Sequence, residues 1–141
     1  MNMSDIVDIA TSGLRAQRTR MTVTASNIAN AQTTRTENGG PYRRRDPVFQ
    51  TERVGSGFAG ALQRKLRAVA VSGIQEDQRP PLTRYLPHHP DANDDGFVDF
   101  PNVNLVEEQA NLVSSSRAFQ ANLLVMQKVR SMAEALMRVG Q

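Results

Sequence analysis

The stretch Asn104–Gly140, "NLVEEQANLVSSSRAFQANLLVMQKVRSMAEALMRVG", decides the fold. It contains no proline, and its apolar residues recur mostly at gaps of three, four and seven positions, which predicts one helix from Leu105 to about Val139. Asn104 is a suitable N-cap residue, and Glu107 and Glu108 favour the positive end of the helix dipole. Gly140 follows the predicted end, as glycine often does after helices.

The predicted C-terminal helix carries two apolar stripes rather than one. The first stripe contains Leu112, Phe119, Leu123, Met126, Ala133 and Met137. The second contains Val106, Ala110, Val113, Val125, Val129, Met132, Leu136 and Val139. A helix with two such stripes contacts neighbours on more than one side. One partner helix covers one stripe, so the other stripe requires further partners.

The N-terminal segment, from Ser4 to about Asn30, shows the same helical spacing. Apolar or small residues fall at Ile6, Ala10, Gly13, Leu14, Met21, Ala25 and Ile28. The run Gly39-Gly40-Pro41 prevents the helix from continuing. We therefore expect long N- and C-terminal helices that pair as an antiparallel coiled coil.

The middle of the chain differs in composition, because six of the seven prolines lie between positions 41 and 90. Short strand candidates are Asp46–Glu52, Leu66–Ile74 and Phe97–Phe100, and the proline-rich stretch 77–90 should be extended. We expect a mainly α protein with a small β or irregular middle, an extended loop-rich centre and no parallel sheet. The expected parts are an N-terminal helix region at 1–34, the β-leaning middle at 35–101 and a C-terminal helix region at 102–141.

Composition excludes several classes of protein. The 141 residues include no cysteine, which excludes disulfides, thiolate nucleophiles and cysteine-ligated zinc. Aromatic residues make up 5% and tryptophan is absent, which favours a helical or extended molecule over a deep core. No apolar run approaches the length of a membrane helix, roughly 18 residues. Asp5 and Asp8 occupy the region where a cleavable signal peptide has basic residues, so we expect none.

The segment Asp91–Asn102, "DANDDGFVDFPN", resembles a calcium-binding loop. Asp91, Asn93, Asp95 and Asp99 stand at loop positions 1, 3, 5 and 9, and a glycine, Gly96, stands at position 6. Position 12 holds Asn102 in place of the bidentate glutamate that such a loop requires, and prolines replace the entering helix. A turn built from Asx side chains, with Gly96 at positive φ, is favoured. A calcium-stabilised binding module that uses this loop remains the alternative function.

Other chemical sites have weaker support. His88 and His89 are adjacent and point different ways on an extended chain, which disfavours a shared transition metal. Arg43–Arg45 lie in no nucleic-acid-binding motif, so a solvated or assembly-facing patch is favoured and no nucleic acid is expected as a partner. Ser114–Ser116 have no histidine near them in sequence. We expect no catalytic residue, cofactor, metal or small-molecule substrate.

Two stretches resemble one known family. "LRAQRTRMTVTASNIANAQTTRT", Leu14–Thr36, is similar to the N-terminal signature of bacterial flagellar rod and hook proteins, with its centre at Ser26–Thr34. "HPDANDDGFVDFPNVNLVEEQANLVSSSRAFQANLLVMQKVRSM", His89–Met132, is similar to the proximal rod members of that family. Together the two stretches cover roughly half of the chain, one toward each end.

The resemblance implies a non-enzymatic, structural subunit of the flagellar basal-body rod, the periplasmic shaft that transmits torque for motility. It implies polymerisation through the terminal helices and export by the flagellar type III pathway without a cleaved signal peptide. The implied partners are other rod proteins, basal-body components and copies of the same chain.

The resemblance also suggests which residues mediate assembly. Small residues near Ser26 allow helices to approach closely, and the amides of Asn27 and Asn30 are expected to fix the register between subunits. On this hypothesis Asn27→Leu blocks assembly but leaves the stability of the subunit nearly unchanged. The full expected set is Ser26, Asn27, Ile28, Asn30, Leu105, Leu112, Phe119, Leu123, Met126, Val129 and Leu136.

Overall fold

The computed structural model describes residues 3–53 and 66–139, which form two long helices and two antiparallel hairpins. In chain order the elements are α1 (Met3–Ala29), β1 (Arg45–Arg53), β2 (Arg67–Glu76), β3 (Leu82–Tyr85), β4 (Phe97–Phe100) and α3 (Leu105–Val139). The expectation of a mainly helical protein with a small β middle is confirmed.

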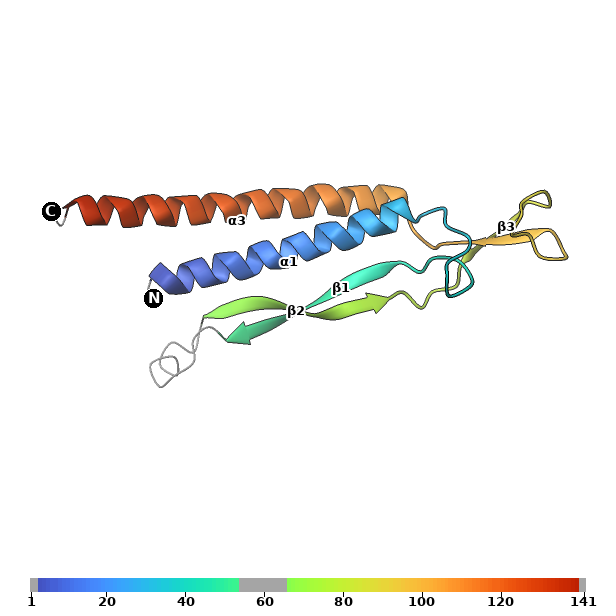
Figure 1. The fold of residues 1–141 in the computed structure, drawn as a ribbon, viewed down its shortest axis with the longest axis horizontal. Helices are drawn as coiled ribbons and strands as arrows, with labels where there is room; N and C mark the ends of the chain where they lie inside the picture. The colour runs from blue at the N-terminus through green and yellow to red at the C-terminus, as the bar shows by residue number, and fades with distance from the viewer. Residues whose placement is uncertain (1–2, 54–65, 140–141) are drawn as a thin grey trace.

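The molecule is elongated, with three layers at one end and a hairpin at the other (Figure 1). α1 lies between α3 on one side and the β1–β2 hairpin on the other, and α1 and α3 run antiparallel. The β3–β4 hairpin extends past the end of the helix pair where α1 ends and α3 begins. Neither helix in the described residues is long and apolar enough to cross a membrane.

α3 begins and ends where its sequence predicts. The side-chain Oδ1 of Asn104 accepts hydrogen bonds from the backbone N–H groups of Val106 at 3.1 Å and Glu107 at 3.4 Å. These bonds satisfy two of the donors that a helix start leaves without partners. The helix then runs without interruption for 35 residues to Val139.

The face of α3 that packs on α1, which we call the inner face, has alternating spacings of four and three residues. Contacts with α1 define it: Glu108 with Asn27, Asn122 with Gly13, and Met126 with Thr11. All of its members are buried or half-buried: Glu108, Leu112, Ser115, Phe119, Asn122, Met126, Val129 and Ala133. The alternation is the 3.5-residue period of helices that pack along their length.

The inner face corrects the predicted stripes in three places. Leu123 and Met137, which were placed in the first stripe, are exposed. Val129, which was placed in the second stripe with the outward residues, is only 4% exposed. Three of the eight inner positions hold polar residues, so a search for apolar spacing alone selects partly wrong positions.

Small residues on α1 allow the two helices to approach closely. Ala10 and Ala16 are buried on this helix, and Gly13 lies between them. A Cβ atom at Gly13 would stand 3.0 Å from the side-chain nitrogen of Asn122, so a larger residue would require the Asn122 side chain to shift. The absence of a side chain at Gly13 therefore allows Asn122 of α3 to approach α1 closely at this position.

The β1–β2 hairpin is attached to α1 by polar and aromatic contacts. Its register runs from Arg45 opposite Glu76 to Arg53 opposite Arg67, with an irregularity between Val48 and Phe49. The backbone N–H of Val69 donates to the hydroxyl of Ser12 at 3.1 Å. The guanidinium of Arg20 lies 4.9 Å from the centre of the Phe49 ring. These contacts hold the hairpin along the helix.

The second hairpin pairs β3 with β4, from Leu82 opposite Phe100 to Tyr85 opposite Phe97. The predicted strand at 97–100 is confirmed, and the strands predicted at 46–52 and 66–74 are confirmed with small shifts at their ends. β3 was expected only to be extended. Prolines flank it on both sides and its residues show no apolar alternation, so the sequence does not indicate a strand there. All pairing among the described strands is antiparallel, as expected.

Candidate functional site

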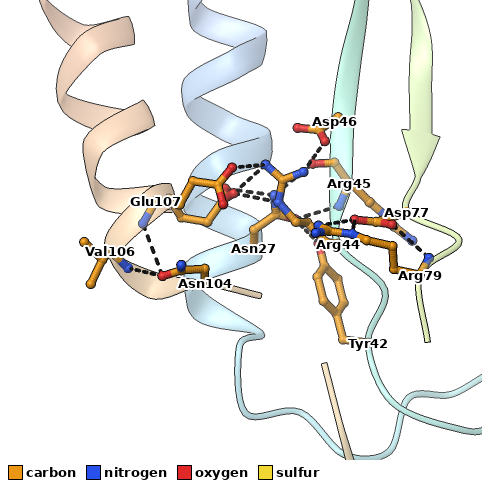
Figure 2. A network of polar contacts seen from close by, with 11 residues as sticks. Asn27, Tyr42, Arg44, Arg45, Asp46, Asp77, Arg79, Asn104, Val106 and Glu107 are labelled. Carbon is orange, nitrogen blue, oxygen red and sulfur yellow. Dashed lines mark hydrogen bonds and ion pairs between the residues drawn. The ribbon is translucent and has the colours of Figure 1, made fainter. Parts of the chain in front are cut away.

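Four side chains from distant parts of the sequence meet where α1 ends, α3 begins and β1 starts (Figure 2). We call this group the polar junction, and its members are Asn27, Tyr42, Arg44 and Glu108. Asn27 and Glu108 are each only 1% exposed, so their polar groups depend on partners within the protein.

Asn27 uses every hydrogen bond that its amide can make. Its Nδ2 donates to the backbone oxygen of Arg45 at 2.8 Å and to Oε2 of Glu108 at 3.0 Å. Its Oδ1 accepts from the backbone N–H of Arg45 at 2.9 Å and from the hydroxyl of Tyr42 at 2.9 Å. Within the subunit no donor or acceptor of this amide remains, so a bond from Asn27 to a neighbouring subunit would require one of these bonds to break.

Glu108 and Arg44 form a largely buried ion pair. Oε1 of Glu108 accepts from Nε of Arg44 at 2.8 Å, and the second guanidinium nitrogen lies 2.7 Å from the same oxygen. Asp46 also binds the guanidinium, and Glu107 lies 3.9 Å from it. Burial alone would lower the pKa of Arg44, but the hydrogen bond and charge of Glu108, together with Asp46, raise it. The guanidinium therefore remains charged.

The polar junction fixes three elements to one another. Asn27 comes from α1, Glu108 from the first turns of α3, and the bonds of Asn27 to Arg45 hold the first residue of β1. A buried polar network is stabilising only when all of its members are paired, so a shift of any one element leaves costly unpaired groups. The junction therefore specifies one arrangement of the helix pair and the β1–β2 hairpin.

The neighbouring signature residues have local roles. The hydroxyls of Ser26 and Tyr42 lie 3.4 Å apart, which places Ser26 at the edge of the junction. Asn30 donates from Nδ2 to the backbone oxygen of Ser26 at 2.9 Å and closes the end of α1. Ile28 is half-buried. The side chain of Asn30 therefore bonds only within the end of α1 and the Asn-rich turn that follows it.

The second candidate site is the exposed apolar surface of α3 outside its contacts with α1, and we call it the outer face. It carries large exposed apolar residues along the length of the helix, from Val106 at 75% exposed to Leu136 at 66%. The members are Val106, Val113, Leu124, Val125, Met132 and Leu136. Exposed apolar surface of this extent is typical of an interface with another molecule.

The expected assembly residues of α3 divide into a buried group and an exposed group. Leu112, Phe119, Met126 and Val129 lie on the inner face and are buried or half-buried against α1. Leu105, Leu123 and Leu136 are exposed at 40%, 42% and 66%. The first group holds the subunit together, and only the second group is accessible to a neighbouring molecule.

The loop that resembles a calcium site is held by its own polar side chains. Oδ1 of Asn93 accepts from the backbone N–H groups of Asp95 at 3.1 Å and Phe97 at 2.8 Å, which confirms an Asx turn. Gly96 has a φ of 81°, as expected for this turn. Asp91 accepts from the hydroxyl of Thr34 at 2.7 Å. Asp99 is on β4 and accepts from Thr83 at 2.7 Å.

The residues of the alternative calcium site are therefore spread over a turn, a strand and a contact with the segment after α1. Within residues 3–53 and 66–139, no three His, Cys, Asp or Glu side chains are placed to hold a metal ion. His89 accepts the backbone N–H of Asp91 at its Nδ1, at 3.1 Å, and so helps to hold the same loop. These contacts give the loop a structural explanation without an ion.

Sequence reasoning missed Tyr42, Arg44 and Glu108. Glu108 was interpreted only as a helix-start residue, and Arg44 only as one of three adjacent arginines. Arg44 and Glu108 lie 64 residues apart in the sequence. Nothing in the local spacing indicates which of the three adjacent arginines points into the protein. The sequence contained one signal for Glu108. The 3.5-residue period places this polar residue on the inner face.

Comparison with known families gives matches at both ends of the chain. Residues 8–35 match the family described as "Flagella basal body rod protein". Residues 94–139 match the family described as "Flagellar basal body rod FlgEFG protein C-terminal". These segments contain most of α1 and α3, which places the chain in the class of flagellar rod proteins.

Full-length relatives specify the family within that class. The chain is 38% identical over 141 residues to the flagellar basal-body rod protein FlgC of Salmonella typhimurium, with complete coverage of both chains. It is 36% identical to FlgC of Borreliella burgdorferi over 151 residues, covering 100% of this chain and 99% of the relative. FlgC of Bacillus subtilis is 36% identical over 146 residues, with 96% of each chain covered. The chain belongs to the FlgC family of flagellar basal-body rod proteins.

Proposed function

We propose that this chain is a structural subunit of the flagellar basal-body rod that polymerises through its terminal helices. The observation that carries the proposal is the outer face of α3, which stays exposed after α1 has covered the inner face. Soluble monomers rarely expose contiguous apolar patches larger than a few hundred Å². Neighbouring subunits in a rod wall would cover this face.

The helix pair supplies the stiff part of the subunit. The alternating spacing of the inner face supports an antiparallel coiled coil, in which side chains of one helix insert between those of the other. The polar junction fixes this pair to the β1–β2 hairpin at one end. A subunit that transmits torque must resist sliding between its elements, and a fully paired buried network provides that resistance.

The proposed partners are other rod proteins, basal-body components and copies of this chain. The proposed location is the periplasmic rod, which the chain reaches through the flagellar export pathway without cleavage of a signal peptide. The working division remains an N-terminal helix region at 1–34, a middle region at 35–101 and a C-terminal helix region at 102–141. The names of the relatives support the proposed location in the rod, and the exposed outer face supports the proposed contacts with other subunits.

Substitutions on the outer face test the proposal. Val106→Glu and Val113→Glu place a charge on the exposed surface near the start of α3, where it does not disturb contacts with α1. We expect normal helix content by circular dichroism, but no rods and no swimming when either variant replaces the native chain. Gln120→Glu, at an exposed polar position of the same helix, is the matched control and should swim normally. Normal swimming of both valine variants would contradict the proposal.

A further inference from the structure

We propose that the tip of the β3–β4 hairpin of one subunit docks on the C-terminal half of the outer face of a second copy of this chain. The tip consists of Tyr85, Phe97, Asp94 and Asp95. The receiving surface consists of Leu124, Lys128 and Met132. This inference rests on the proposed function, and it adds a specific contact between copies of the chain.

The tip combines exposed aromatic surface with negative charge. Tyr85 is 63% exposed and Phe97 is 42% exposed, and their rings meet edge to face with centres 5.3 Å apart. Asp94 and Asp95 are exposed, and neither carboxylate has an ion pair or hydrogen bond within the described residues. A surface of this kind is complementary to an apolar surface that carries a cation.

The tip is also held rigidly. The two hydrogen bonds to Oδ1 of Asn93 close the turn, and Gly96 packs so tightly that an added Cβ would lie 2.9 Å from the Tyr85 ring. A rigid surface loses little conformational entropy on binding, which favours its use as a contact.

The receiving surface has the complementary character. Leu124 and Met132 are 59% and 52% exposed, and Lys128 lies midway between them at a spacing of four residues. The exposed ammonium group of Lys128 has no acidic partner in the part of the chain that the structure describes. By contrast, nearby Arg130 is paired with Glu134 at 3.2 Å. An apolar strip with an unpaired cation therefore matches the acidic, aromatic tip.

The two surfaces cannot meet within one molecule. The β3–β4 hairpin extends past the end of the helix pair where α3 begins (Figure 1). Lys128 lies 23 residues further along α3 from Leu105, which corresponds to about 35 Å at a rise of 1.5 Å per residue. The contact must therefore join different molecules. Because the two surfaces differ, it is head-to-tail and continues from copy to copy, which suits an extended assembly.

Cysteine cross-linking tests the contact directly, because the native chain contains no cysteine. Full-length Asp95→Cys and Lys128→Cys proteins are mixed at high concentration and oxidised. We expect a disulfide-linked dimer in the mixture and little product from either protein alone, since a disulfide requires Cα atoms within roughly 7 Å. Arg130→Cys, at nearly the same height on the helix but on another side, is the control partner and should give several times less dimer.

Each other cross-linking result overturns the contact. Equal yields with Lys128→Cys and Arg130→Cys would show random collision. A dimer of Lys128→Cys alone would show that the outer faces of two copies of α3 pack on each other instead.

Charge exchange in cells tests whether the second copy is the occupant. Lys128→Glu and Asp95→Lys should each reduce swimming roughly tenfold or more, because like charges then face each other. A chain that carries both substitutions should recover most of the loss. Normal swimming of both single variants would show that the contact is absent, and a double variant as defective as the singles would show that a different protein occupies the surface. Either result leaves the outcome for Val113→Glu, and hence the proposed rod function, unaffected.

Discussion

Replacement of Asn27 by leucine removes the centre of the polar junction while keeping the number and branching of the side-chain heavy atoms. Four groups then lose a partner: the N–H and C=O of Arg45, the Tyr42 hydroxyl and Oε2 of Glu108. The Tyr42 hydroxyl can turn to Ser26, which already lies 3.4 Å away. The carboxylate oxygen of Glu108 and the backbone of Arg45 have no comparable replacement.

The magnitude follows from these unpaired groups. A buried polar group without a partner costs about 1 to 3 kcal/mol, so we expect Asn27→Leu to lower the free energy of unfolding by about 3 to 5 kcal/mol. A protein of this size has a total stability of about 5 to 15 kcal/mol, so the loss is a large fraction. With a urea dependence of about 2 kcal/mol per M, the unfolding midpoint should fall by roughly 2 M.

Urea unfolding of the purified subunit, followed by circular dichroism, measures this loss. Asn30→Ala is the control, because that side chain makes only local bonds at the end of α1, and its cost should stay below about 1 kcal/mol. A midpoint for Asn27→Leu within error of the native chain would refute the assignment of Asn27 to an internal network. That outcome would restore the sequence-based hypothesis that Asn27 acts only between subunits.

Three further perturbations have defined outcomes. Arg44→Ala leaves the buried carboxylate of Glu108 without its cation and should cost about 3 kcal/mol or more in urea unfolding; a loss below about 1 kcal/mol would show that the pair is not important. Gly96→Ala forces a side chain onto a φ of 81° and against a tyrosine ring, so hydrogen exchange in the β3–β4 hairpin should accelerate while that of the helices is unchanged. The hydrogen bonds from Arg79 lower the pKa of Asp77 from its ordinary value of 3.8, so Asp77 stabilises the fold above that value and loses this effect as pH falls. Asp77→Asn should therefore be less stable than the native chain at pH 6 and nearly equal to it at pH 2, and a constant difference would contradict the pairing.

The sequence predicted regular structure best where one local signal dominates. α3 was predicted with its correct bounds because Asn104 caps its start and no proline interrupts it. β3 was not predicted as a strand, because its pairing with β4 supplies the structure that its own residues do not indicate. The turn at Asn93 and Gly96 was predicted because its chemistry depends on a few neighbouring residues.

The candidate sites were harder to predict because they depend on contacts between distant residues. Asn27 was selected from the sequence as an assembly residue, but its partners Arg45 and Glu108 become neighbours only after α1, α3 and β1 pack together. Val129 and Leu123 were assigned to the wrong faces for a related reason. The face that packs on α1 includes the polar residues Glu108, Ser115 and Asn122. A search for apolar periodicity does not detect polar residues.

Burial of the outer face in the assembled rod can be measured by the chemical reactivity of one outer-face residue before and after assembly. Val113→Cys is a conservative change at a half-exposed position and introduces the only cysteine into the chain. The account predicts rapid labelling by a maleimide in the isolated subunit and strong protection in purified basal bodies from swimming cells. Equally rapid labelling in assembled rods would show that no neighbour covers the outer face, and it would contradict the claim that α3 builds the rod through this surface.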